Sequence, residues 1–219
     1  MHGMPAPLHV EIWSDVVCPW CYVGKRRFEA ALDAFPQRDD VEVLWRSFEL
    51  DPHAPPVRDL PGDEHLAAKY GLTVEDARGM NAQLTELAAA EGLEYHLDRT
   101  RGGSTFDAHR VIHLAAARGR QEEVQERIMR GYFTEGEPVG DRAALIRLAA
   151  DAGLDPAEAD AALQTDAYAD EVRADEELAQ RIGIRGVPYF VLNRRFGVSG
   201  AQPAEVLLQA FERAQQDAA

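Results

Sequence analysis

Apolar and polar residues alternate near both ends of the chain, as in β-strands, and apolar residues recur at helical spacing in the middle. Residues 8–13 and 41–48 read as strands, and residues 19–35 between them have helical periodicity that ends at Pro36. A strand, a helix and a second strand in this order predict a βαβ unit with parallel strands and a right-handed crossover.

The middle of the chain is predicted to be almost entirely helical. Residues 51–62 contain four prolines among few apolar residues, which indicates a loop or linker before the helices begin. Thr73 is a candidate N-cap for the first long helix. Glycine-containing breaks divide the rest, and the helices are expected at about 73–91, 106–118, 122–134, 142–152, 156–164 and 168–182.

The end of the chain returns to β-structure. Residues 188–192 and 196–199 flank Asn193-Arg194-Arg195, a pattern typical of a β-hairpin. A last helix is expected from Pro203 to about residue 215, because the first helical turn tolerates proline. The predicted organisation is therefore βαβ, a long helical insertion and ββα, an α/β protein.

Composition excludes several classes of function. The chain has 219 residues, of which 46% are hydrophobic, and 38 acidic residues outnumber 23 basic ones to give a net charge of −15. Such a charge repels phosphate backbones, and no basic patch compensates for it, so we expect no nucleic-acid partner. No apolar run is long enough to span a membrane. The first residues do not resemble a secretory signal, and the expected location is cytoplasmic.

The two cysteines, Cys18 and Cys21, are three positions apart, where the first strand gives way to the first helix. The free N–H groups and partial positive charge of a helix start favour a thiolate at Cys18. Pro19 suits the first helical position, which needs no N–H donor. Cys21 lies one turn further on and is placed to resolve a mixed disulfide that Cys18 forms. This context favours a redox-active dithiol.

Two other interpretations of the cysteine pair remain open. In the first, the pair forms half of a zinc site, which would need two more ligands, for example from His9, His109 and His113. Alternatively, the two thiols are buried and inert. We predict no metal.

Gly186-Val187-Pro188-Tyr189 opens the penultimate strand. A proline at a strand start marks an edge or a turn. The residues alone favour an ordinary trans proline. The alternative is a cis Val187–Pro188 bond, whose turn would present the backbone of Val187 beside the cysteines.

These motifs together resemble the DsbA family of thioredoxin-fold proteins, specifically its FrnE-like branch, over essentially the whole chain. The matching segments are Ser14-Asp15-x-x-Cys18-Pro19-Trp20-Cys21-Tyr22-x-Gly24, Ser104-Thr105-Phe106-Asp107-Ala108-His109-Arg110 and Gly186-Val187-Pro188-Tyr189-Phe190. The resemblance implies a thioredoxin fold in residues 1–55 and 167–219, with a helical domain inserted at 56–166. It also implies that the proline is cis.

The resemblance implies roles for particular residues. Cys18 would be the nucleophile and Cys21 the resolving thiol, with Pro19 and Trp20 tuning the redox potential. Substrate would bind at Val187, Pro188 and His109. The family often has asparagine where this chain has Ser104. A related branch, the 2-hydroxychromene-2-carboxylate isomerases and kappa-class glutathione transferases, has serine in place of Cys18.

Three other features of the sequence give weaker signals. His109 and His113 are four positions apart, but a packed or surface histidine pair explains them as well as a metal site does. Residues 102–105 form either an anion site or a flexible loop with an N-cap. Glu11 or Asp15 is a candidate carboxylate for relaying a proton to Cys21, or a solvated residue at the strand end.

The sequence thus predicts a thiol–disulfide oxidoreductase acting on protein or small-molecule thiols and disulfides. It needs no cofactor, although glutathione is a candidate co-substrate, and it is expected to be a monomer or homodimer. The alternatives are a glutathione-dependent isomerase or transferase and a redox-sensing binding module.

Overall fold

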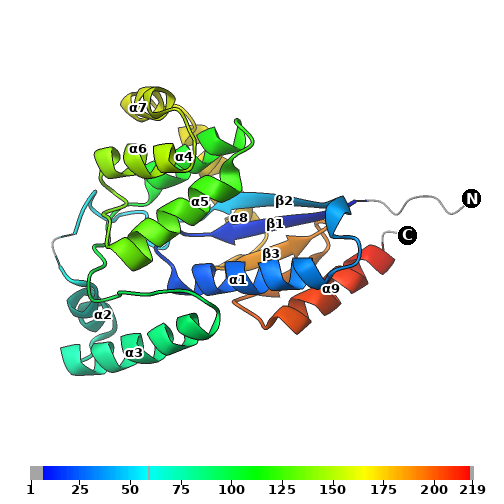
Figure 1. Cartoon of the computed structure of the whole chain (residues 1–219), viewed down its shortest axis with the longest axis horizontal. Coiled ribbons are helices and arrows are strands. Elements are labelled where there is room, and N and C mark those ends of the chain that lie inside the picture. The colour runs from blue at the N-terminus through cyan, green and yellow to red at the C-terminus, as the bar shows by residue number, and fades with distance from the viewer. Residues whose placement is uncertain (1–6, 59, 218–219) are drawn as a thin grey trace, which may run out of the picture. The chain divides into compact units, whose positions relative to one another are not determined.

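The structure, a computed structural model, describes residues 7–58 and 60–217, and in it four strands form one mixed sheet. The strand order is β2-β1-β3-β4. Strands β1 and β2 are parallel, while β1–β3 and β3–β4 are antiparallel (Figure 1). The strands span Leu8–Ser14 (β1), Val41–Ser47 (β2), Tyr189–Leu192 (β3) and Phe196–Ser199 (β4).

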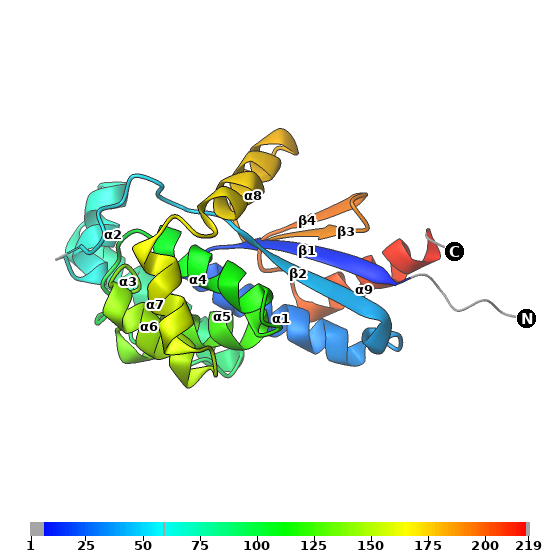
Figure 2. The ribbon, with the colours of Figure 1, turned by 90° about the horizontal axis from the view of Figure 1, so that it is seen from above.

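Helices cover both faces of this sheet (Figure 2). Helices α1 (Pro19–Ala34) and α9 (Ala204–Gln216) lie on one face, and the C-terminal part of α8 (Ala169–Arg181) lies on the other. A short 3₁₀ turn, η1 (Arg38–Asp40), leads from α1 into β2. Each large apolar side chain that is fully buried on such a face contributes about 1.5–3 kcal/mol. The buried core under α1 and α9 comprises Leu8, Val10, Ile12, Phe28, Ala31, Phe35, Trp45, Phe190, Leu192, Leu207, Phe211 and Ala214.

Phe28 of α1 lies at the centre of this core. Its ring centroid is 5.9 Å from that of Phe190 in a stacked arrangement and 5.7 Å from that of Phe211 in an edge-to-face arrangement. It also contacts Trp45 of β2 edge to face, at 6.3 Å. One helical side chain therefore binds elements from both ends of the sequence, and each such aromatic pair adds about 0.5–1.5 kcal/mol to the free energy of area burial.

The opposite face of the sheet carries a charged network. Arg46 of β2 donates a hydrogen bond of 3.1 Å to Glu11 of β1 and one of 2.7 Å to Asp175 of α8. The second carboxylate oxygen of Asp175 accepts the Ser47 backbone N–H at 2.9 Å, and its carbonyl accepts the Trp13 indole N–H at 3.0 Å. These bonds attach α8 to both parallel strands.

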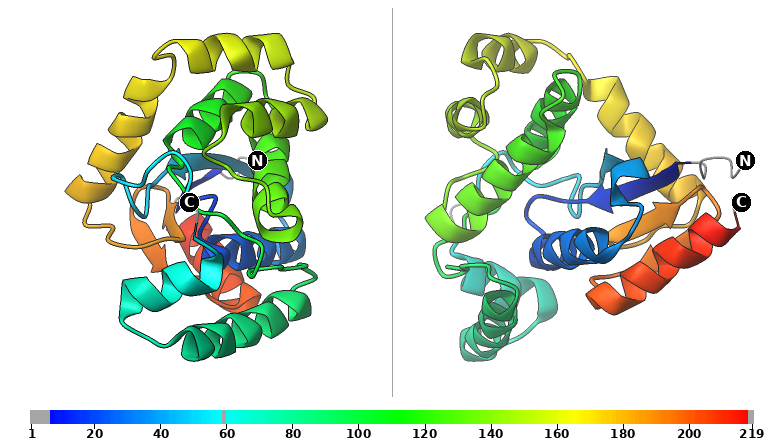
Figure 3. Two further views of the ribbon diagram at one scale, coloured as in Figure 1. Left: turned by 90° about the vertical axis from the view of Figure 1, so that its left-hand side faces the viewer. Right: turned by 45° about the vertical axis from the view of Figure 1, so that its right-hand side comes forward.

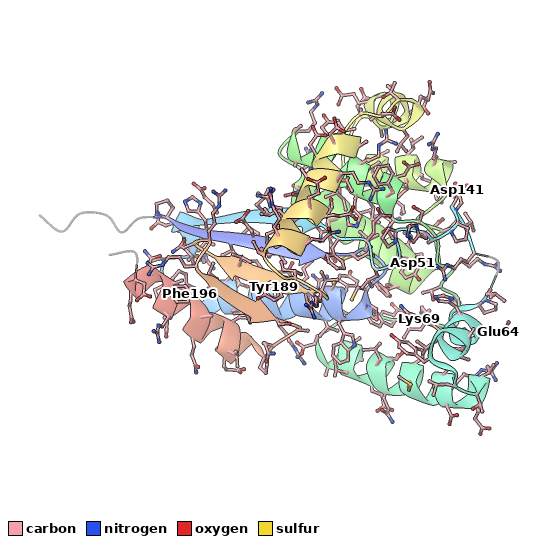
Figure 4. All side chains as sticks on the ribbon, turned by 180° about the vertical axis from the view of Figure 1, so that it is seen from behind. Asp51, Glu64, Lys69, Asp141, Tyr189 and Phe196 are labelled. Carbon is pink, nitrogen blue, oxygen red and sulfur yellow. The ribbon has the colours of Figure 1, made fainter. Side chains whose placement is uncertain are left out.

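The hairpin predicted near the end of the chain is confirmed. Residues 193–195 connect β3 to β4, and Asn193 and Arg194 have φ angles of 49° and 56°, the positive values that suit a tight turn between twisted strands. The Asn193 side-chain oxygen accepts the backbone N–H of His9 at 3.0 Å, which fixes the turn to β1. Figure 4 shows Tyr189 and Phe196 on the two strands of the hairpin.

The second unit is built of helices. Helix α2 packs against α3, and α4 to α7 pack against one another (Figure 3). Helix α5 continues into a π-helical turn, η2. The elements span Gly62–Tyr70 (α2), Val74–Ala90 (α3), Phe106–Ala116 (α4), Gln121–Arg130 (α5), Gly131–Glu135 (η2), Arg142–Asp151 (α6) and Pro156–Gln164 (α7).

Local sequence signals account for most of these helix ends. Thr73 caps α3 as predicted, and it forms a capping box in which its side chain accepts from the backbone N–H of Asp76. Two details differ from the sequence-based expectation. Helix α2 was not predicted as a separate element, and η2 replaces the last turn of what was predicted as one α-helix.

The chain divides into two units, Met1–Phe48 with Asp175–Ala219 and Glu49–Ala174. The sequence suggests divisions at 55/56 and 166/167. The first observed division is earlier because β2 already ends at Ser47. The second is later, inside α8, because Asp175 is the residue at which that helix binds Arg46. No helix in the described part of the chain is long and apolar enough to cross a membrane.

We predict that Asp175→Ala will lower the free energy of unfolding by about 1–3 kcal/mol, because Arg46 keeps only Glu11 as its partner and the Ser47 backbone N–H loses its acceptor. The Asp175 side chain is 2% exposed. The control is Glu42→Ala, which breaks an exposed ion pair with His9 and should cost less than about 1 kcal/mol. Urea denaturation measures both, and equal losses would contradict the role of the network.

Candidate active site

Cys18 lies at the start of helix α1, as the sequence predicts. It is the N-cap residue, with extended backbone angles, and Pro19 begins the helix. The backbone N–H of Cys18 donates to the Asp15 carbonyl at 3.1 Å, and its own carbonyl accepts from Cys21 at 3.0 Å. A tight turn therefore joins β1 to α1 and leaves the Cys18 sulfur at the positive end of the helix dipole.

The Cys18 thiol meets the loop before β3. Its Sγ donates to the backbone carbonyl of Val187 at 3.6 Å, although the two residues are 169 positions apart. The Val187–Pro188 peptide bond is cis. The carbonyl oxygen of Pro188 accepts from Gly200, at 2.8 Å. The contact between Cys18 and Val187 therefore places the polar Val187 carbonyl directly beside the Cys18 sulfur.

Gly24 of α1 supports this loop through close packing. A Cβ atom at Gly24 would lie 2.8 Å from Cγ of Pro188 and 3.5 Å from Cβ of Ala201. Real Cβ atoms do not approach other carbon atoms to 2.8 Å, so any larger residue at this position must displace the proline ring. The absence of a side chain at Gly24 thus lets α1 and the Val187–Pro188 loop approach each other.

Cys21 is buried behind Cys18, with 1% of its surface exposed. Both cysteines are free thiols. Burial raises the pKa of Cys21 well above its ordinary value, and contact with the Cys18 thiol raises it further. The backbone N–H of Asp15, 3.5 Å from the Cys21 sulfur, and the hydroxyl of Ser14 oppose this effect on the pKa. Reduced Cys21 is therefore a protonated thiol at neutral pH.

Glu11 does not contact Cys21, and its proposed role as a proton relay is wrong. Side chains alternate along a strand, so Glu11 lies on the face of β1 opposite to Ile12. There its carboxylate accepts from Arg46 and forms a second ion pair with Arg194, at 3.5 Å. Asp15 reaches the Cys21 sulfur through its backbone N–H.

The residues between the cysteines differ in exposure. Trp20 has 43% of its surface exposed, while Pro19 and Val187 are half-buried. Exposed indole rings bind apolar and peptide surfaces well, because one side is apolar and the N–H remains available. Tuning of the redox potential by Pro19 and Trp20 remains a prediction.

His109 and its neighbours lie in the second unit, on helix α4. His109 is buried, with 3% exposed, and its substrate-binding role remains a prediction. Arg110 has a structural role, since it donates to the carbonyls of Ala167 at 2.8 Å and Ala162 at 2.5 Å. Asp107, 2.8 Å from Arg110, completes this cluster. Part of the motif around His109 therefore holds the end of α7.

The glycine-rich segment before α4 contacts the linker predicted from its prolines. The N–H of Ser104 donates to the Pro55 carbonyl at 2.8 Å, and a Cβ at Gly103 would lie 2.2 Å from the Pro56 oxygen. Ser104 also accepts the N–H of Phe106 at 3.3 Å through its side chain. The Ser104 amide is thus used within the protein rather than by an anion. Within residues 7–58 and 60–217, no three His, Cys, Asp or Glu side chains gather as metal ligands.

The geometry of the two thiols agrees with comparisons to known proteins. A family model described as the DSBA-like thioredoxin domain matches residues 9–212. The chain belongs to this family. Membership confirms the resemblance to the DsbA family drawn from the cysteine and proline motifs, and it agrees with the thioredoxin fold and its helical insertion.

Individual relatives extend over nearly the whole length of the chain. The uncharacterized protein YwbO of Bacillus subtilis (strain 168) is 30% identical over 206 residues, which cover 93% of this chain and 96% of YwbO. A crystal structure from Streptomyces coelicolor, described as probable DsbA oxidoreductase SCO1869, is 52% identical with a TM-score of 0.91. It covers 96% of this chain and 91% of its own.

A more distant structure shares the fold alone. The cytosolic disulfide reductase DsbM from Pseudomonas aeruginosa, solved with GSH, is 18% identical and has a TM-score of 0.62. The match covers 95% of this chain and 96% of that one. The DSBA-like architecture is therefore kept at low sequence identity.

We predict that Gly24→Ala will lower the free energy of unfolding by about 1–3 kcal/mol, because the new methyl group overpacks against Pro188. The matched control is Gly79→Ala in helix α3, where nothing lies within 4 Å of the added methyl group. That change should stabilise the protein by about 0.5–1 kcal/mol, as alanine does in a helix. Urea midpoints measure both variants, and stabilisation by Gly24→Ala would refute the close approach.

Proposed function

We propose that the protein is a thiol–disulfide oxidoreductase that uses Cys18 and Cys21 as its redox couple. The supporting observation is the pair of unlike thiols on one helix. The Cys18 sulfur lies at the helix start beside a backbone carbonyl, and Cys21 is buried one turn behind it. Membership of the DSBA-like family agrees with this chemistry.

The proposed cycle has two exchange steps. In the first, the Cys18 thiolate attacks one sulfur of a substrate disulfide, forms a mixed disulfide, and releases the other sulfur as a thiolate that takes up a proton. In the second, Cys21 loses its proton and attacks the Cys18 sulfur. The bond between Cys18 and the substrate sulfur breaks, and the substrate thiolate leaves and takes up a proton, so one substrate thiol is released. The enzyme dithiol is oxidised by two electrons, and the substrate disulfide is reduced. The reverse sequence oxidises a substrate dithiol.

Burial separates the roles of the two cysteines. Cys21 is protonated at neutral pH and shielded by the core, so it does not react with external disulfides. Once Cys18 carries a substrate sulfur, Cys21 attacks from inside the protein, where the effective concentration is high. The order of attack thus follows from the environment of each sulfur.

The substrates proposed are thiols and disulfides, with glutathione as a co-substrate. The exposed Trp20 and the half-buried Val187 provide apolar and backbone contacts next to the nucleophile. The structure of DsbM with GSH offers support for glutathione through a shared fold. We also propose that the protein acts in the cytoplasm.

We predict that Cys18→Ser will reduce glutathione-coupled disulfide exchange to background, because a serine hydroxyl is not ionised at neutral pH. Cys21→Ser should instead retain the first attack and accumulate a mixed disulfide with the substrate, visible as an added mass on the intact protein. Each serine variant is the control for the other, since both remove one sulfur from the same helix.

Two outcomes would contradict this function. Full exchange activity in Cys18→Ser would remove the nucleophile from the mechanism. Failure of Cys21→Ser to trap any mixed disulfide would overturn the assignment of the resolving thiol. Saturable, non-covalent binding of reduced glutathione by an exchange-inactive protein would favour the glutathione-dependent isomerase or transferase.

A further inference from the structure

Ser14 is a buried hydroxyl on the same side of the sheet as the cysteine helix. It is the last residue of β1, and strand alternation places it on the face of Val10 and Ile12, which α1 covers. Only 3% of its surface is exposed. The neighbouring Asp15 touches the Cys21 sulfur with its backbone N–H, so the end of β1 lies directly against Cys21.

Among the residues that the structure describes, the Ser14 hydroxyl makes no hydrogen bond, yet it lies close enough to Cys21 to lower the pKa of that thiol. A buried hydroxyl without a partner costs about 1–3 kcal/mol. This cost is offset if the hydroxyl makes a hydrogen bond to the neighbouring sulfur in another protonation state of that sulfur. The state in question is the Cys21 thiolate, because a hydroxyl rotates freely and changes from acceptor to donor.

The resolving step produces this thiolate in a poor environment for charge. Burial disfavours the ionised sulfur, and the Asp15 N–H, 3.5 Å away, supplies one backbone hydrogen bond to it. A second donor from Ser14 would be charge-assisted and therefore stronger than a neutral hydrogen bond. The carboxylate considered from the sequence, Glu11, is on the other face of the sheet, bound to Arg46.

We propose that Ser14 is a positioning residue for the resolving step, whose hydroxyl donates a hydrogen bond to the Cys21 thiolate as it attacks Cys18. No proton is transferred to Ser14, and the proton that Cys21 loses is balanced by the one that the leaving substrate thiolate takes up. Ser14 acts only through Cys21, so its effect belongs to the second exchange step and not to the first. This inference rests on the proposed exchange function for its consequence in turnover, but not for its effect on Cys21.

The direct test measures ionisation of Cys21 in a Cys18→Ser background, where it is the sole thiol. The rate of alkylation by iodoacetamide is recorded against pH for the full chain. Adding Ser14→Ala should raise the pKa of Cys21 by about one to two pH units, which corresponds to the loss of one hydrogen bond to a charged group. The matched control is Ser47→Ala, a buried serine paired with Ser14 on the neighbouring strand.

A second pair of variants separates the hydroxyl from packing. Ser14→Thr keeps the hydroxyl and should keep the alkylation profile close to that of serine, whereas Ser14→Val has the same shape without it and should behave as alanine does. An unchanged profile in Ser14→Ala, or equal profiles for the threonine and valine variants, would overturn the proposal. An equal shift in Ser47→Ala would also overturn it.

The consequence for turnover is tested with both cysteines present. In rapid mixing with glutathione disulfide, Ser14→Ala should leave the first attack unchanged and slow decay of the mixed disulfide by about tenfold or more, in line with the change in thiolate fraction. Slowing of the first attack instead would contradict the assignment. If the wild-type protein performs no exchange while Cys21 still responds to Ser14, the proposed function fails and the contact with Ser14 stands.

Discussion

The packing of Phe28 against three partners is the constraint on which the candidate site depends. Phe28 lies ten positions after Cys18 in the same helix, and its ring touches Trp45 of β2, Phe190 of β3 and Phe211 of α9. These partners come from both ends of the chain. Because interiors are close-packed, this contact fixes the rotation and height of α1 over the sheet. The position of both sulfur atoms relative to the Val187–Pro188 loop follows from it.

The two faces of β1 have different tasks. One face is apolar and ends in Ser14, whose buried hydroxyl lowers the pKa of Cys21. The other carries Glu11, which joins Arg46 and Asp175 in a network that attaches α8. Alternation along β1 thus keeps the Glu11 carboxylate away from Cys21, whose pKa is raised mainly by burial. The chemistry thus depends on a division that strand alternation imposes on neighbouring residues.

Local sequence signals predicted much of the fold and part of the site. Some features depend on only a few neighbouring residues and can therefore be predicted from a single sequence. They include the Thr73 cap, the alternating strands and the placement of Cys18 at a helix start. The contact between Gly24 and Pro188 cannot be predicted from such signals, because residues far apart in the chain create it. The position of Ser14 on the face that α1 covers could have been predicted, because Ser14 alternates with Val10 and Ile12 along the same strand. The same alternation excludes Glu11 as a partner of Cys21, although its carboxylate makes it a candidate by residue type.

Cys18 and Cys21 are proposed to act as one two-electron couple. The most direct test is to equilibrate the protein in buffers with graded ratios of reduced and oxidised glutathione, and then to alkylate it and count the labelled thiols by mass. We expect the two thiols to disappear together as an internal disulfide forms, along a two-electron curve whose midpoint defines the direction of exchange. Persistence of both free thiols, or of glutathione adducts alone, at every ratio would contradict it.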